Sequence, residues 1–554
     1  MSETHQVLNQ VEPLTSHNSF TKNALFQETV KRIGAGWAED RLNTFGELMG
    51  RPETIELGFA ANAHPPVLLT HDTSGRRLDK VEFHPAFHEL MRIAVQNQLH
   101  SLPWTEKISG ENQRHQVRAM QLMLAAQNEA GHCCPISMTY AVVPALAAAP
   151  SLEAIWKPLI TTNVYDPRFI PYYEKKGLIL GMAMTEKQGG SDVRANTTFA
   201  RPLKTRTVGA PYLLTGHKWF CSHPMADGFL VLAQTEKGLS CFLVPRFTED
   251  GQKNNIFIQR LKNKLGNRSN ASSEIEFEST TGYLVGEEGR GVPTIIEMVN
   301  HTRLDCMISA SAIMRQAQTL ALNHIAHRKA FGKLLVDQPL MQNVISDISL
   351  EAEAAMLLTL RVAEAYDQKE ENPKEASFRR IATAIGKYFT TKRTPPVVAE
   401  ALECLGGNGY VEESGMPRLL KESPVNSIWE GSGNVICLDV LRAIGKEPQS
   451  LVAYFEEIEK TRGADNRLDL YMDGLKKDLN ALLANSDQSC LENQARSIVE
   501  RLAMALAASL MLRHSPDFMA EAYLSSRVAL QAPGYSLGTL AATTPFSEII
   551  KRAF

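Results

Sequence analysis

A block of short strand-like segments constrains the fold of this 554-residue chain more than any other feature. The segments contain many β-branched or aromatic residues and are separated by Gly, Asp, Asn or Pro, which is typical of strands joined by turns. They cover residues 178–184, 212–221, 228–234, 239–247, 256–261 and 273–277. Because their connections are too short for crossover helices, the pattern predicts a domain of antiparallel strands.

Helical periodicity lies on both sides of this block. It covers residues 87–152 and returns from Val292 to about Ile444, with breaks expected at Gly332, Pro339, Pro373, Pro395–Pro396 and Gly406–Gly409. Gly445–Ser450 predicts a linker, followed by more helix to about Leu512. The sequence thus predicts an α+β fold with four parts: an N-terminal arm and helical domain (1–177), a β-strand domain (178–290), a helical bundle (291–445) and a C-terminal helical extension (446–554).

Composition limits the class of protein. The 58 Lys and Arg against 61 Asp and Glu give a net charge of −3, which removes the simplest argument for a nucleic-acid binder. The first twenty residues show no secretory signal, and no apolar run reaches the ~18 residues of a membrane span. The eight cysteines show no CxxC spacing, so we expect free thiols in a cytoplasmic protein, with Cys133 and Cys134 as small buried side chains.

Three segments carry chemistry, although no GxGxxG motif indicates a Rossmann site. Met182–Asp192 (MAMTEKQGGSD) places hydroxyls around a glycine pair after a strand, where a simple turn is the alternative. Leu214–Ser222 (LTGHKWFCS) ends a strand with two aromatics and a hydroxyl, where core residues are the alternative. Ser427–Asn434 (SIWEGSGN) sets one carboxylate beside a Trp, which favours a base, and a helix N-terminal acid is the alternative.

Together and in this order, these segments resemble the acyl-CoA dehydrogenase superfamily over residues 90–445. Met184–Asp192 is similar to the family's MTEPxAGSD, with Lys187 in place of Pro and Gly189 in place of Ala. Gly216–Ser222 resembles GxKxWIT, and Lys264–Phe277 (KLGNRSNASSEIEF) resembles KxGxRxSxTxxxxF. Leu284–Arg303 is similar to the turn and helix that follow.

The resemblance implies an FAD cofactor and an acyl thioester substrate. It places Thr185 and Ser191 at the flavin and the substrate, Phe220 at the stacking aromatic, and Ser222 at the hydroxyl that meets flavin N5. The other flavin contacts expected from these motifs are Met182, Met184, Gly190, Cys221, Ile428, Trp429, Gly431 and Asn434.

Two further motifs imply contacts to FAD and an oligomer of two or four subunits, with a homotetramer expected. Arg328, Phe331 and Gln338 resemble the RxxFG…Q element that reaches the FAD of a neighbouring subunit. Gly406 and Gly407 are similar to QxxGG, but Glu403 stands where the family has Gln. An ionised carboxylate can only accept a hydrogen bond where the amide can also donate one.

The family reaction is α,β-dehydrogenation, and Glu430 is the expected base because it matches the Glu of the family's IYEGT. Ser432 matches its flavin-contacting Thr. Some branches carry the base on the first helix after the strand domain, where this chain has Thr302 and no carboxylate. Asp305 is the nearest alternative to Glu430.

Nearly the whole chain resembles the DNA-alkylation-response branch of the family, through TEKQGGSD, KLGNRSNAS, PVNSIWEGSGN and residues 35–88. That branch implies weak dehydrogenation of short or branched acyl-CoA and binding of double-stranded DNA. The alternative is an ordinary short- or branched-chain dehydrogenase or oxidase without a DNA role.

For DNA contact, Ala376–Arg393 offers five cations and no acid, with Arg380 and Lys387 on one helical face. The alternatives are a solvated face, or contact with a coenzyme A phosphate or a partner subunit. The extension is slightly acidic, 12 − 14 = −2, but contains Arg496, Arg501 and Arg513. The pairs His84/His88 and His324/His327 lack a third metal ligand, so no metal is expected.

Overall fold

The computed structural model describes residues 4–105, 110–484, 487–529 and 537–554, and the chain forms two compact units. Residues 53–109 and 128–305 form one unit, which we call the sheet unit. Residues 1–52, 110–127 and 306–554 form the other, the helical unit. Helix α8 (Gly291–His327) begins in the first unit and ends in the second.

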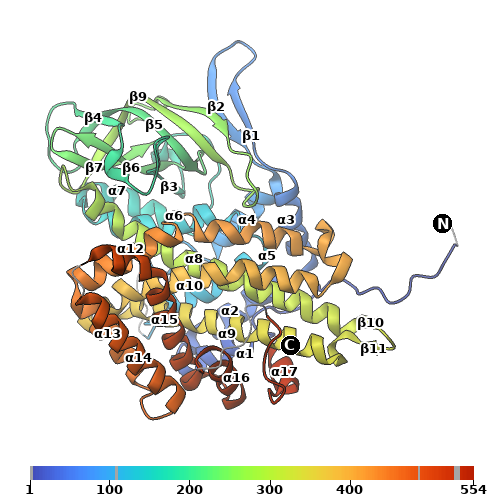
Figure 1. Ribbon diagram of the computed structural model, residues 1–554. Coiled ribbons are helices and arrows are strands. Elements are labelled where there is room, and N and C mark those ends of the chain that lie inside the picture. The colour runs from blue at the N-terminus through green and yellow to red at the C-terminus, as the bar shows by residue number, and fades with distance from the viewer. Residues whose placement is uncertain (1–3, 106–109, 485–486, 530–536) are drawn as a thin grey trace. The chain divides into compact units, whose positions relative to one another are not determined.

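The sheet unit is built on seven strands (Figure 1). Its elements are α3 (Pro52–Ala63), β1 (Val67–His71), β2 (Arg77–Glu82), α4 (Pro85–Gln96), α6 (Cys133–Leu146), α7 (Pro150–Ile160), β3 (Leu180–Ala183), β4 (Phe199–Pro202), β5 (Pro211–Ser222), β6 (Gly228–Thr235), β7 (Gly238–Pro245), β8 (Ile256–Leu261) and β9 (Ser272–Val285). The strand order is β3-β6-β4-β5-β9-β7, with β8 paired to β9 and β6 also paired to β7. β1 and β2 form a separate antiparallel hairpin.

The sheet is mixed, which corrects the prediction of an antiparallel domain. β3 pairs with β6 in parallel from Leu180↔Gly228 to Ala183↔Val231, and β4 meets β6 in parallel at Phe199. The chain between β3 and β6 passes through β4 and β5, so this parallel pair needs no crossover helix of its own. The other pairings in the sheet are antiparallel, including the long β5–β9 ladder.

Alternating side chains explain which strands could be predicted. Tyr212, Leu214, Phe229, Phe242 and Phe277 join one buried core. β8 matches the predicted range, whereas β9 continues through the polar stretch Glu278–Gly282, where the apolar pattern is lost. β4, β1 and β2 were not predicted because they are short and mostly half-exposed.

The helical unit packs its helices around α10 (Pro373–Glu403). The others are α1 (Ala24–Arg32), α2 (Glu39–Met49), α5 (Arg114–Asn128), α9 (Pro339–Gln368), α11 (Met416–Glu422), α12 (Gly433–Lys446), α13 (Pro448–Glu459), α14 (Asn466–Leu483), α15 (Gln488–His514), α16 (Asp517–Arg527) and α17 (Phe546–Ala553). A small hairpin, β10 (Lys329–Ala330) and β11 (Lys333–Leu334), precedes α9. No helix among the described residues is long and apolar enough to cross a membrane.

The expected break at Pro395–Pro396 is wrong, because α10 continues to Glu403. Prolines remove backbone donors and disfavour a helix interior, but α9, α11, α12, α13 and α15 all pack along α10 and hold it straight. Burial of Val397, Val398 and Ala401 contributes to that packing. The breaks expected at Gly332, Pro339, Pro373 and Gly406–Gly409 are present.

The C-terminal extension is part of the helical unit, and the linker predicted at Gly445–Ser450 is wrong. Only Glu447 separates α12 from α13. α13 packs on α10, and α15 packs on both α9 and α10 (Figure 1). The turn-forming residues there cap consecutive helices instead of separating domains.

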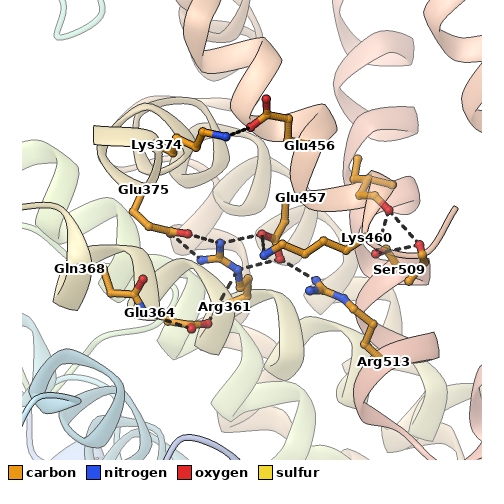
Figure 2. Close-up of polar contacts among 12 residues, drawn as sticks. Arg361, Glu364, Gln368, Lys374, Glu375, Glu456, Glu457, Lys460, Ser509 and Arg513 are labelled. Carbon is orange, nitrogen blue, oxygen red and sulfur yellow. Dashed lines mark hydrogen bonds and ion pairs between the residues drawn. The ribbon is translucent and has the colours of Figure 1, made fainter. Parts of the chain in front are cut away.

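A buried ion-pair network ties the extension to the bundle (Figure 2). The Arg361 guanidinium donates to both oxygens of Glu375 and, at 2.8 and 2.9 Å, to both oxygens of Glu457 on α13. Lys460 and Arg513 reach the same Glu457 carboxylate at 2.7 and 2.6 Å. Burial alone would raise the pKa of Glu457, but these three cations hold it well below its usual range.

We predict that Arg361→Met destabilises the protein by about 3–5 kcal/mol at pH 7, because the buried Glu457 and the half-buried Glu375 lose their shared partner. The low folded-state pKa of Glu457 stabilises the fold above pH ~4.5, the ordinary carboxyl range, and this contribution is lost on acidification. The deficit of the variant should therefore shrink as the pH falls below that value. Urea unfolding of the wild type and the variant, at pH 7 and at a pH below ~4.5, measures the change in this deficit.

Arg462→Met is the matched control, since Arg462 pairs with Glu459 and Asp473 at the surface. Its cost should stay below about 1 kcal/mol. Equal stability losses for the two variants would contradict the structural role of the network.

Candidate functional site

In the sheet unit, the loop after β3 is anchored by a fully buried ion pair. Lys218 on β5 donates to Glu186 at 2.7 Å and to the Leu232 carbonyl at 2.7 Å. Glu186 also accepts hydrogen bonds from the Thr197 and Thr198 backbone. Burial would raise the pKa of Glu186, but Lys218 and these donors lower it to about 2, so the pair is ionised and fixes the start of the loop.

The loop itself folds closely around Thr185. The Thr185 carbonyl accepts a hydrogen bond from Trp219 N at 2.8 Å, and a Cβ built on Gly190 would lie 2.4 Å from Thr185 Oγ1. Only glycine fits at position 190. Thr185 is half-buried and Ser191 is exposed, so both hydroxyls are available to a ligand, beside the half-buried Met182 and Met184.

The end of β5 presents alternate residues to opposite faces. Phe220 is 50% exposed and Ser222 is half-buried, whereas Cys221 is fully buried in the sheet core. Cys221 can therefore offer a ligand only its backbone. The Lys262 ammonium lies 4.8 Å from the Phe220 ring centroid and 3.3 Å from that of Trp219.

In the helical unit, Glu430 lies in a strained turn between a 3-10 helix (Ser423–Ser427) and α12. Its φ is +60°, in the left-handed region that a residue other than glycine rarely adopts, and Gly431 follows at +106°. Lys387 on α10 is 1% exposed and donates to the carbonyls of Trp429 and Gly431, at 2.8 and 2.5 Å. One buried ammonium thus fixes the backbone on both sides of Glu430.

Some side chains around Glu430 are fixed by hydrogen bonds, and others are exposed to solvent. Trp429 Nε1 donates to Asn426, whose amide donates to Ser309 of α8. Ile428 is 64% exposed. Ser432 is the N-cap residue of α12, although its hydroxyl makes no capping hydrogen bond, and Asn434 accepts from Arg496 at 2.8 Å.

The β10–β11 hairpin presents Phe331 to solvent. Phe331 is 99% exposed with a φ of +52°, followed by Gly332 at +78°. The base of the hairpin is fixed by Asn9, which exchanges two hydrogen bonds with the Lys329 backbone and accepts from Arg328 through its carbonyl. Gln338 donates to the Ala330 carbonyl at 3.1 Å.

The glycine turn after α10 is open. Gly406, in the left-handed region at +59°, and Gly407 are exposed, and a Cβ on either would meet no atom within 4 Å. Glu403 is exposed beside Glu400. Burial, together with the charges of Glu403 and Asp347, raises the pKa of Glu400.

Family models match three successive parts of the chain. They are the adaptive response protein AidB N-terminal domain at residues 9–167, the acyl-CoA dehydrogenase middle domain at 181–280 and the acyl-CoA dehydrogenase C-terminal domain at 289–445. The Escherichia coli (strain K12) protein named putative acyl-CoA dehydrogenase AidB is 44% identical over 522 residues, 94% of each chain. The chain belongs to the acyl-CoA dehydrogenase family.

Solved structures agree with this assignment. The crystal structure of Caenorhabditis elegans ACDH-11 in complex with C11-CoA has a TM-score of 0.85 at 26% identity, covering 100% of this chain and 93% of that one. A Bacillus anthracis acyl-CoA dehydrogenase complexed with FAD shares the fold, with a TM-score of 0.64 at 18% identity over 79% of each chain. The predicted fold class and the oxidoreductase family are confirmed.

The acyl-CoA dehydrogenase family uses FAD, and the residues present fit that group. A flavin needs an aromatic surface, hydroxyls and closely approaching backbone. In this chain Phe220 and Ser222 share one face of β5, the Gly190 turn excludes any side chain, and the turn at Gly406–Gly407 has open space. Within the sheet unit, Phe220, Ser222 and the Gly190 turn would hold the flavin, and within the helical unit the Gly406–Gly407 turn would leave room for backbone contact with the cofactor.

The two positions on α8 that were considered in place of Glu430 are both buried. Thr302 is buried in α8 and its hydroxyl donates to the Val299 carbonyl at 3.0 Å. Asp305 is 5% exposed in the same helix. Glu430 remains the candidate.

The cations of Ala376–Arg393 do not form the continuous basic face predicted for DNA, because Lys387 is buried and Arg379, Arg380 and Arg393 are half-buried, whereas Lys392 is exposed. Lys387 holds the Glu430 turn. Arg380 pairs with Asp439 and Glu447, and Arg393 pairs with Glu351. Arg380 and Arg393 thus neutralise the buried acids Asp439 and Glu351.

The arginines expected on the extension also have partners. Arg501 pairs with Asp478, Arg513 with Glu457, and Arg496 bonds to Asn434. The histidine pairs have structural partners too: His84 caps α4, and His88 bonds to Tyr165. Within the described ranges, no three His, Cys, Asp or Glu side chains gather as a metal site would require.

Sequence reasoning missed the residues that hold the site. The sequence pattern places Lys387 on an exposed helical face. It includes Lys218 only as the lysine of the segment that resembles GxKxWIT, with no structural role. Asn9, in the N-terminal arm, had no motif at all. A lysine within an apolar helical or strand pattern is the one signal that could have suggested burial with a partner.

We predict that Lys387→Met lowers the free energy of unfolding by about 2–3 kcal/mol, since two carbonyls lose charge-assisted hydrogen bonds. The Glu430 turn should loosen, so acyl-CoA should reduce the flavin more slowly at unchanged FAD content. Lys374→Met, at an exposed position of the same helix, is the control. Wild-type rate and stability in Lys387→Met would show that the turn needs no such anchor.

Proposed function

We propose that the protein catalyses α,β-dehydrogenation of acyl-CoA thioesters with Glu430 as the base. The observation that carries the proposal is the strained, doubly anchored turn that fixes the Glu430 backbone. Left-handed backbone at a residue other than glycine persists only where the surrounding structure enforces it, and such strain concentrates at functional sites. A carboxylate fixed in this way need not reorganise to take a proton.

In this proposal, different residues carry out proton removal and cofactor binding. Glu430 takes the α-proton of the thioester, and the FAD supplies the acceptor at N5 for the β-hydride. Thr185, Ser191, Phe220 and Ser222 would contact the flavin, and Thr185 and Ser191 would also contact the substrate. Exclusion of water by the bound substrate would strengthen the hydrogen bonds that polarise the thioester carbonyl.

The substrate class rests on the relatives. The crystal structure of Caenorhabditis elegans ACDH-11 is a complex with C11-CoA, and the structural match to it covers 100% of this chain. Short or branched acyl chains and weak turnover are proposed from the sequence resemblance alone, and the alternative is an ordinary short- or branched-chain acyl-CoA dehydrogenase or oxidase without a DNA role. The eight cysteines are all free thiols, which supports the proposal of a cytoplasmic protein.

Glu430→Gln keeps the size of the side chain but cannot accept the proton. We expect anaerobic flavin reduction by a reactive acyl-CoA to slow by about 10²–10⁴-fold at unchanged FAD content. Glu413→Gln, an exposed position in the same unit, should react at the wild-type rate. Unimpaired reduction in Glu430→Gln would transfer the role to another residue, with Asp305 the first to be tested.

We also propose a homo-oligomer, a tetramer, in which the hairpin reaches a neighbouring subunit's FAD. The supporting observation is the solvent-exposed ring of Phe331 on a hairpin fixed at its base.

Arg328→Ala removes one of the three hydrogen bonds between Asn9 and the hairpin, together with the side chain proposed to reach the FAD, so FAD retention and assembly should fall together. Flavin absorbance and sedimentation measure the two properties. Lys333→Ala, exposed on the same hairpin, should change neither. Loss of flavin from a variant that assembles normally would separate the two and refute the shared role.

The proposed role with double-stranded DNA rests on the sequence resemblance alone, and the paired cations do not favour it. Phosphate-driven binding weakens with salt by about −0.9 in log–log slope per neutralised phosphate. We expect any binding to be weak and Arg380→Ala to leave its slope unchanged, because Arg380 is already paired. No binding of the wild type at ~50 mM salt would remove the DNA role for this chain.

A further inference from the structure

A cluster of Glu129, His132 and Cys133 lies in the sheet unit and has no part in the proposed dehydrogenation. Glu129 follows the end of α5, and Cys133 is the first residue of α6. All three residues are buried, with exposed fractions of 1%, 2% and 7%.

The carboxylate holds the imidazole in one orientation. Glu129 Oε2 lies 2.9 Å from His132 Nδ1 and accepts from His132 N at 2.8 Å. Glu129 Oε1 accepts from Gly131 N and from the Ser269 hydroxyl, both at 2.8 Å. A Cβ on Gly131 would collide with Ser269 Oγ at 2.0 Å, so the turn requires glycine.

The other nitrogen of the ring faces sulfur. His132 Nε2 lies 3.8 Å from Cys133 Sγ, which is long but within reach of a hydrogen bond to sulfur. Cys133 Sγ also lies 3.6 Å from the Glu129 carbonyl, the acceptor available to a protonated thiol. The proton therefore has two positions, on the sulfur or on the imidazole.

The charges around His132 favour the protonated form of its ring. Burial alone would lower the pKa of His132, but Cys133 and Glu129 raise it to about 10. Burial would likewise raise the pKa of Glu129, which His132 and Ser269 lower to about 2. The first turn of α6 adds the positive end of its helix dipole beside the sulfur.

We propose that Cys133 is a nucleophilic thiolate, paired with a His132 imidazolium that Glu129 orients, and that it forms covalent adducts with small uncharged carbon electrophiles. The 7% exposure of Cys133 restricts the reagent to small molecules. With an alkyl halide, the sulfur lone pair forms the C–S bond, and the halide leaves with the electron pair of the broken carbon–halogen bond. No oxidant or reductant is needed.

Four other buried thiols are neutral. Burial raises the pKa of Cys221, Cys241 and Cys404 to about 12 and that of Cys437 to about 11. They are inert neutral thiols at neutral pH. Cys490, half-buried on α15, is the more accessible reference thiol.

The test is iodoacetamide labelling of the FAD-loaded protein, with each cysteine followed by peptide mass spectrometry. At pH 6 we expect Cys133 to react at least ~10-fold faster than Cys490, despite its lower exposure. An ordinary thiol, with a pKa of about 8.5, gains roughly tenfold in rate per pH unit in this range. Cys133 should instead change by less than ~3-fold between pH 6 and pH 8.

His132→Gln removes the charge and keeps a polar side chain of similar length. It should slow labelling of Cys133 at pH 6 by at least ~10-fold while Cys490 is unaffected. Ser269→Ala, which leaves His132 in place, should slow it less. The wild-type measurement stands even where His132→Gln does not fold. Cys133 reacting more slowly than Cys490 at pH 6, or with the pH dependence of an ordinary thiol, would overturn the proposal.

Discussion

The buried ammonium of Lys387 is the constraint on which the helical unit depends. It donates to the carbonyls on both sides of Glu430 and holds that residue in left-handed backbone. A lysine can be buried only where its charge is matched by strong acceptors and water is excluded. Therefore α10 must lie at the centre of the unit, and α9, α12, α13 and α15 cover it. The extension beyond residue 446 is part of that cover.

The sheet unit uses the same device. Lys218 is buried against Glu186 and the Leu232 carbonyl, and this pair fixes the loop that carries Thr185 and Ser191. In both units, a polar loop with a proposed role in ligand binding is fixed by hydrogen bonds from a buried lysine. Loops are ordinarily the mobile parts of a fold, and a buried charge-assisted contact restricts them without occupying their exposed side.

The sequence predicted the parts of the fold that follow from periodicity. β8 and the order of helices, strands and helices came from alternation and three- to four-residue spacing, which depend on local burial. The errors at Pro395–Pro396, at Gly445–Ser450 and along Ala376–Arg393 share one cause. Each segment carries surface-like or helix-breaking residues whose environment is set by distant helices. The candidate site residues came from motif resemblance, whereas Lys387 and Asn9 act through contacts that no motif records.

The central claim is that Glu430, fixed in its turn, takes the α-proton of an acyl thioester. Proton exchange tests it without turnover. The FAD-loaded protein is incubated in deuterium oxide with a thioester that cannot lose a β-hydride, and deuterium at Cα is followed by mass spectrometry. The account predicts exchange by the wild type and a loss of about 10²–10⁴-fold in Glu430→Gln. Equal exchange by the two proteins would contradict it.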